Sequence, residues 1–180
     1  GRGGEVRGWM KKVRTPSRAG ITAPTSAHDV TGLLNEMRRI KDDSELAIMR
    51  RAATVSAGAH ARAMRMAKPG LHEYQIDAEL LHEFRHHGYD FPAYTSIVAT
   101  GANACVLHYR AGDTVMQDGD LVLIDAGCEL DGYASDITRT FPANGRFTPA
   151  QTTLYELVLA GQHAAIAAIR PGMRFMDGHD

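Results

Sequence analysis

The chain has little of the features that mark special classes of protein. Its 180 residues include only two cysteines, Cys105 and Cys128, so no disulfide framework holds the fold together. The formal net charge is −1, which gives no global attraction to nucleic acid. Uninterrupted apolar runs such as residues 121–124 are far shorter than the roughly 20 residues of a membrane span. We therefore expect a globular protein with no membrane span and no nucleic-acid partner.

The two cysteines and the chain ends also set expectations about location and organisation. Cys105 and Cys128 are interpreted as small buried side chains in a reducing compartment, and no signal peptide pattern opens the chain. Residue 1 is Gly rather than Met, and the last residues follow an apparent helix end, so both ends look like cuts. We expect a cytoplasmic, truncated protein.

The first 30 residues differ in composition from the rest. Basic residues are frequent there, with Glu5 as the only acid before Asp29, and apolar periodicity is weak. A basic arm for nucleic acid is one interpretation, and a solvated piece of a larger protein is the simpler one. We expect residues 1–40 to be the remnant of an N-terminal domain with its linker, and residues 41–180 to belong to the next domain.

Apolar spacing predicts three helices and four strands. Residues 44–67 and 74–86 have helical periodicity, and a third helix begins at Thr148, where Thr148 and Gln151 make a capping box around Pro149. The apolar face of the first helix is expected to comprise Leu46, Met49, Ala53, Ala57, Ala61 and Met64. Strands are predicted at 93–100, 104–110, 121–129 and 133–141. Strands that follow one another without helical crossovers favour an α+β domain with a largely antiparallel sheet flanked by helices.

One short motif resembles a zinc-binding helix. Residues 82–86 read His-Glu-Phe-Arg-His, and two histidines four residues apart share a helix face, with Glu83 as a candidate base. On a helical wheel, however, His82 and His86 fall mostly opposite the apolar face that contains Leu80 and Phe84. We therefore interpret them as surface histidines.

Two aspartates near a predicted hairpin are the strongest candidates for chemistry. The apolar run 121–124, expected to be buried on both faces, leads directly into Asp125. If Asp131-Gly132 forms the turn, Asp125 lies opposite Thr138; a slightly shifted turn places it opposite Asp136. Both registers bring the two carboxylates together on one face, which is unfavourable without a positive partner. A divalent cation and a salt bridge both remain open as that partner.

Segments 90–98, 107–109 and 121–141 together are similar to the Xaa-Pro aminopeptidases of the pita-bread metallopeptidase family. The similarity covers about residues 35–172 and includes Asn35-Glu36-Met37-Arg38 and the exit Arg170-Pro171-Gly172. It implies that residues 41–180 are the first half of a pita-bread catalytic domain. It also implies a peptidase that releases the first residue from peptides with proline at position two, with two Mn²⁺ ions as cofactors.

The resemblance assigns roles to individual residues. Asp125 and Asp136 match two metal ligands, and His108 matches the catalytic histidine beside the metal that also contacts substrate. Tyr94 is assigned to substrate binding, and Gly127 and Thr138 to support of the ligands. The resemblance further implies a peptide as partner and allows a homo-oligomer of the full-length protein.

The family's centre needs one further His and two Glu, and no residue after Asp136 matches their motifs. We therefore expect this chain to have little or no activity alone. A prolidase-like Xaa-Pro dipeptidase is the main alternative. The other is a pita-bread domain used only for binding, which would have no need of Asp125 and Asp136.

Overall fold

The computed structural model describes residues 2–14, 24, 26 and 28–179. The chain divides into two compact units, Gly1–Asp42 and Asp43–Asp180. This division falls close to the boundary expected at residue 40. That the first unit is the remnant of a larger domain stays a prediction.

The first unit contains two helices, α1 (Arg2–Arg14) and α2 (Thr31–Arg39). Weak apolar periodicity had not predicted α1. Asp29 precedes α2, and its Oδ1 accepts the hydroxyl of Thr31 at 2.6 Å and the backbone N–H of Thr31 at 2.9 Å. These hydrogen bonds lower the pKa of the Asp29 carboxyl. Arg18 of the basic segment lies outside the described residues.

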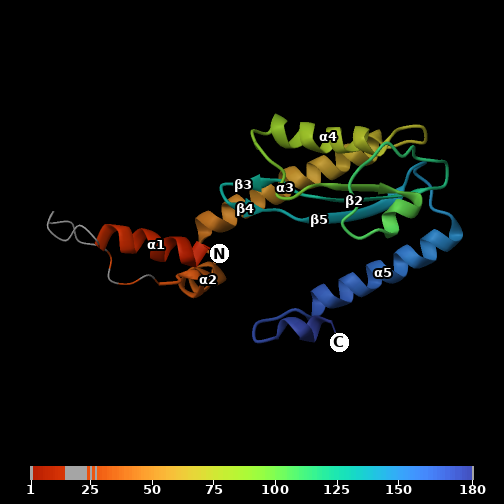
Figure 1. The fold of residues 1–180 in the computed structure, drawn as a ribbon. Coiled ribbons are helices and arrows are strands. Elements are labelled where there is room, and N and C mark those ends of the chain that lie inside the picture. The colour runs from red at the N-terminus through yellow and green to blue at the C-terminus, as the bar shows by residue number, and fades with distance from the viewer. Residues whose placement is uncertain (1, 15–23, 25, 27, 180) are drawn as a thin grey trace. The chain divides into compact units, whose positions relative to one another are not determined.

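The second unit is built on a three-stranded antiparallel sheet (Figure 1). Its strands β1 (Ile97–Thr100), β2 (Leu121–Ala126) and β5 (Ile137–Pro142) lie in the order β1-β2-β5. A small hairpin of β3 (Glu129–Leu130) and β4 (Tyr133–Ala134) lies between β2 and β5 in sequence. The predicted α+β class with antiparallel pairing is confirmed.

Helices α3 (Asp43–Met66) and α4 (Glu73–His86) lie together along one face of this sheet (Figure 1). Both match the predicted helices within one residue at each end. Val122, Ile124 and Ala126 alternate along β2 and are completely buried in the core shared with these helices. The intervening residues of β2 are only half-buried, so the expectation of a strand buried on both faces was wrong.

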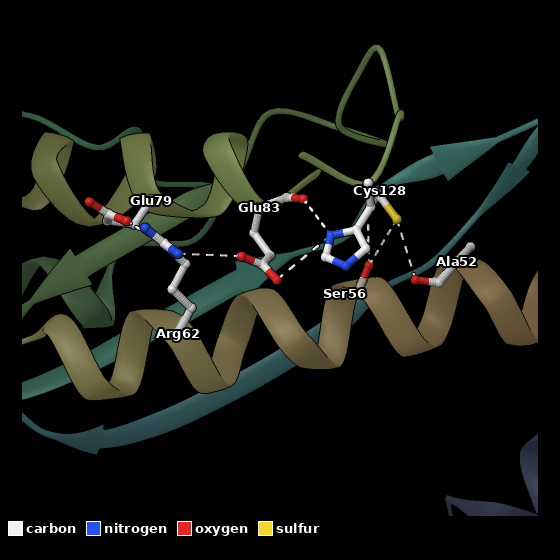
Figure 2. Close-up of polar contacts among 7 residues, drawn as sticks. Ala52, Ser56, Arg62, Glu79, Glu83 and Cys128 are labelled. Carbon is white, nitrogen blue, oxygen red and sulfur yellow. Dashed lines mark hydrogen bonds and ion pairs between the residues drawn. The ribbon is translucent and has the colours of Figure 1, made fainter. Parts of the chain in front are cut away.

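The apolar face predicted for α3 was also wrong. Ala53 and Ala57 are exposed, whereas Ser56 and His60 are buried. The reason is that both polar side chains find partners on the sheet side: Ser56 Oγ accepts the backbone N–H of Cys128 at 2.9 Å (Figure 2), and His60 Nε2 lies 3.0 Å from the carbonyl oxygen of Ala126. A polar side chain that makes a hydrogen bond in the core can be buried, so polarity alone gave the wrong face.

Small side chains and polar contacts join α3 to its neighbours. Ala52, Ala59 and Ala63 have no exposed surface, which allows close approach of the helix to the core. Farther along α3, Arg62 pairs with Glu79 of α4 at 2.6 Å and with Glu83 at 3.6 Å (Figure 2). These contacts fix α3 against both α4 and the segment that follows β2.

The predicted strand at 104–110 does not form. Residues Gly101–Cys105 make a 3-10 helix, and a turn follows in which the N–H of Tyr109 donates to the carbonyl oxygen of Val106. Gly101 has a φ of +54° and His108 a φ of +55°, and neither angle belongs to a strand. The apolar and β-branched residues of this segment misled the prediction. Cys105 is exposed, against expectation, and Cys128 is buried.

The last long helix, α5 (Pro149–Ala168), begins with the predicted capping box. Thr148 Oγ1 accepts the N–H of Gln151, and Gln151 Oε1 accepts the N–H of Thr148 at 2.9 Å. No residue of α5 is buried, and Val158 is 71% exposed. A 3-10 helix, Phe175–Gly178, follows. Within the described part of the chain, no helix is both long and apolar enough to span a bilayer.

Candidate metal centre

The two aspartates lie on neighbouring strands at the end of the sheet. Asp125 belongs to β2 and pairs with Thr138 of β5, while Asp136 directly precedes β5. This is the register in which Asp131-Gly132 forms the turn, and both turn residues have the positive φ, +49° and +86°, that type I′ turns require. The turn chemistry therefore selects between the two registers that the sequence left open.

A tyrosine joins the two carboxylates directly. The hydroxyl of Tyr94 lies 2.5 Å from Oδ1 of Asp125 and 3.0 Å from Oδ1 of Asp136. Burial and the hydrogen bonds to the two carboxylates raise the pKa of the Tyr94 phenol far above its usual value. The phenol therefore stays protonated, and its single proton faces two carboxylate oxygens at once.

Basic side chains do not neutralise this pair. Among the described residues, neither Asp125 nor Asp136 takes part in an ion pair. Arg139 is close in sequence, but it pairs across the sheet with buried Ile124, and its charge acts on His60 on the α3 side. The salt-bridge interpretation of the two aspartates therefore has no support among the described residues, although Arg110 lines the same pocket.

The carboxylates open into a pocket of about 400 Å³. His108, from the turn after the 3-10 helix, lines this pocket together with Tyr94 and both aspartates. The left-handed backbone at His108 is unusual for a residue other than Gly and occurs at the third position of its turn. Four of the six predicted site residues therefore share one cavity.

Gly127 and Thr138 lie beside the pocket without lining it. Thr138 is the cross-strand partner of Asp125 on the same face of the sheet. Gly127 lies where two backbone segments cross: a Cβ at this position would be 1.7 Å from the carbonyl oxygen of Ser135. Its own carbonyl accepts the N–H of Ala93 at 2.8 Å. Gly127 thus brings the segment that carries Tyr94 against the hairpin that carries Asp136.

Sequence reasoning missed four residues of the pocket, Thr95, Ile97, Tyr109 and Arg110. Ile97 is present because β1 pairs with β2 and places it opposite Asp125. Nothing in the sequence pattern specified this pairing. Arg110 follows His108 and Tyr109, so its position close to a predicted site residue was the one available signal.

The donor set fits a hard divalent cation in part. Two convergent carboxylates offer the oxygen ligands that such ions prefer. Across residues 2–14, 24, 26 and 28–179, however, no group of three or more His, Cys, Asp or Glu residues is arranged to hold a metal ion. The structure does not support a zinc site on the helix that contains residues 82–86. His82 and His86 are exposed, and Glu83 pairs with Arg62.

Comparison with known proteins identifies the family. The sequence model of Metallopeptidase family M24 matches residues 47–180. The chain belongs to metallopeptidase family M24. Xaa-Pro aminopeptidase of Escherichia coli (strain K12) is 46% identical over 172 residues, which make up 96% of this chain and 39% of that relative. Human Xaa-Pro dipeptidase is 40% identical over 149 residues, which are 80% of this chain and 30% of the human protein.

Solved structures agree with this assignment. The M24 chain is similar to the structure of Pseudomonas aeruginosa aminopeptidase PepP, with 51% identity and a TM-score of 0.90. The match covers 97% of this chain and 40% of that structure. The expected pita-bread fold is therefore confirmed, and the chain spans well under half the length of these relatives.

Proposed function

We propose that this chain supplies two ligands, Asp125 and Asp136, to the metal centre of an Xaa-Pro aminopeptidase. Such an enzyme releases the first residue from peptides that have proline at position two. The observation that carries the proposal is the meeting of both carboxylates at the Tyr94 hydroxyl, with no ion pair to either carboxylate among the described residues. Membership of a metallopeptidase family and the similarity to the Xaa-Pro aminopeptidase of E. coli support it.

Mn²⁺ is the proposed ion, with two ions in a complete site, because carboxylate oxygens suit hard divalent cations. When bound, such ions supply an acidified water as nucleophile and stabilise negative charge on the carbonyl oxygen of the substrate. The chain's own contribution is to hold Asp125 and Asp136 side by side before binding. This arrangement lowers the reorganisation needed when the cation enters.

His108 and Tyr94 are proposed to act on the peptide. His108 is exposed in the pocket, where its imidazole can contact substrate and move a proton at a ring nitrogen. The Tyr94 hydroxyl donates to the carboxylates and keeps its proton, so it serves as a hydrogen-bond donor and not as a base. Arg110 adds positive charge to the lining of the same pocket.

We further propose that the 180-residue chain alone has little or no peptidase activity. The described residues offer no group of three ligands, and two carboxylates hold Mn²⁺ only weakly. The purified chain with excess Mn²⁺ should leave an Arg-Pro-Pro peptide uncut when products are followed by mass spectrometry. Clear release of arginine that disappears in Asp136→Asn would contradict this proposal.

A dipeptidase is the second candidate, favoured by the 40% identity to human Xaa-Pro dipeptidase. The test uses a protein that includes these 180 residues and is as long as the relatives. We expect it to cleave Arg-Pro-Pro much faster than Gly-Pro. The reverse preference would establish the dipeptidase. If Asp125→Asn cleaved either peptide as fast as the unmodified protein, both proposed activities would be refuted.

A further inference from the structure

Glu73 is a completely buried carboxylate at the first position of α4. Its Oε1 accepts the backbone N–H of Thr100 at 2.8 Å and the side-chain amide of Asn103 at 3.0 Å. Its Oε2 accepts the hydroxyl of Tyr109 at 2.8 Å and the backbone N–H of Gly112 at 3.1 Å. One carboxylate therefore ties the end of β1, the 3-10 helix and the following loop to α4.

The carboxylate has no cationic partner among the described residues, because none of their ion pairs includes Glu73. A buried carboxylate without a cation is costly unless several donors satisfy it. Four donors do so here, and the start of a helix favours negative charge. So dense a set of donors around a single acid indicates that the loop conformation depends on it.

This loop is the segment that carries His108. Two of the four donors, Tyr109 and Gly112, follow His108 closely, and the other two, Thr100 and Asn103, precede it. His108 itself is exposed and has the left-handed φ of +55°, so its own side chain gives no evident reason for this conformation. The anchored residues on both sides hold the backbone of His108 in place.

We propose that Glu73 is a positioning residue that holds His108 in the pocket beside Asp125 and Asp136. It acts through Tyr109 and Gly112 and does not touch the pocket itself. The importance of His108 rests on the proposed function, whereas the dependence of its conformation on Glu73 does not. Glu73 lies far from His108 in sequence, and no metal-binding pattern includes it.

The test compares Glu73→Gln with Glu79→Gln in the 180-residue chain. Glu79 lies on the same helix and also pairs with a donor, Arg62, whereas its hydrogen bonds and ion pairs among the described residues do not include the loop. In Glu73→Gln, the amide NH₂ replaces either Oε1 or Oε2. In the first position it faces the N–H of Thr100 and in the second the N–H of Gly112, and neither N–H can accept a hydrogen bond. At least one backbone N–H, that of buried Thr100 or half-buried Gly112, therefore loses its partner.

The primary readout is the three-bond H–N–Cα–H coupling of His108 by NMR, which reports its φ. We expect it to shift toward the value of an extended residue in Glu73→Gln, while amide signals of α3 remain in place. Hydrogen exchange of the Gly112 amide should become at least about tenfold faster. Glu79→Gln should change neither quantity.

A second arm adds excess Mn²⁺. In the unmodified chain it should broaden the His108 ring signals and the amides of Asp125 and Asp136. In Glu73→Gln the broadening of the His108 ring signals should weaken relative to that of the aspartate amides. If Mn²⁺ broadens neither aspartate amide in the unmodified chain, the proposed metal site fails, and the His108 coupling still decides the role of Glu73.

Tyr109→Phe keeps the proposal testable if Glu73→Gln does not fold. It removes one of the four hydrogen bonds to Glu73 and retains the ring, so it should shift the His108 coupling in the same direction by a smaller amount. Glu73 has no positioning role if the coupling is unchanged in every variant that folds.

Discussion

Replacement of Gly127 by alanine should destabilise the second unit strongly. The added Cβ would lie 1.7 Å from the carbonyl oxygen of Ser135 and 2.4 Å from its carbonyl carbon. Both are backbone atoms, so the clash cannot be relieved by rotation of a side chain. Overpacking of a core costs typically 1–3 kcal/mol, and separation of two backbone segments belongs at or above the upper end, at about 3 kcal/mol. That is a large share of the roughly 5–15 kcal/mol that stabilises a domain.

The matched control is Gly161→Ala in α5. A Cβ at Gly161 meets no atom within 4 Å, and alanine favours a helix interior over glycine by up to about 1 kcal/mol. Urea unfolding followed by circular dichroism measures both variants. We expect Gly127→Ala to lose about 3 kcal/mol and Gly161→Ala to lose nothing. A Gly127→Ala chain within about 0.5 kcal/mol of the unmodified chain would refute the backbone-crossing argument.

Two further predictions concern the polar groups buried under α3. Ser56→Ala leaves the backbone N–H of Cys128 without its acceptor, and urea unfolding should show a loss of about 1–3 kcal/mol, against little change for the exposed Thr54→Ala. Burial lowers the pKa of His60 below its ordinary value of 6.5, and its buried Nδ1 makes no hydrogen bond with the described residues. The unfolded chain therefore binds the proton more readily, so the free energy of unfolding should fall as the pH drops below about 6.5. Urea unfolding of His60→Gln across this range should show a shallower fall, and an equal fall in both chains would exclude His60 as the cause.

The parts of this fold that were predictable depend on local chemistry. Asp131-Gly132 favoured a two-residue turn, and of the two registers left open the one centred on this turn forms, with positive φ at both positions. Thr148 and Gln151 specified the start of α5 through bonds that they make with each other. The neighbourhood of Asp125 and Asp136 followed from the turn, because strand alternation placed both on one face.

The parts that were not predictable depend on distant partners. The buried face of α3 includes Ser56, whose partner Cys128 lies 72 residues away. The pattern of residues 104–110 predicts a strand, but hydrogen bonds to the distant acceptor Glu73 on α4 give this region another conformation. Tyr94 meets the two aspartates where the N–H of Ala93 donates to the carbonyl oxygen of Gly127 and Pro92 pairs with Cys128. Local patterns carry no information about such pairings, so they emerge only from the three-dimensional structure.

The most direct test of the candidate metal centre is Mn²⁺ binding by the 180-residue chain, measured by isothermal titration calorimetry. We expect weak binding in the unmodified chain, loss of binding in Asp125→Asn and in Asp136→Asn, and no change in Asp118→Asn, whose carboxylate lies elsewhere and accepts from Asn144. The paired-carboxylate account would be contradicted if the unmodified chain bound no Mn²⁺ at large excess, or if either site variant bound it equally well.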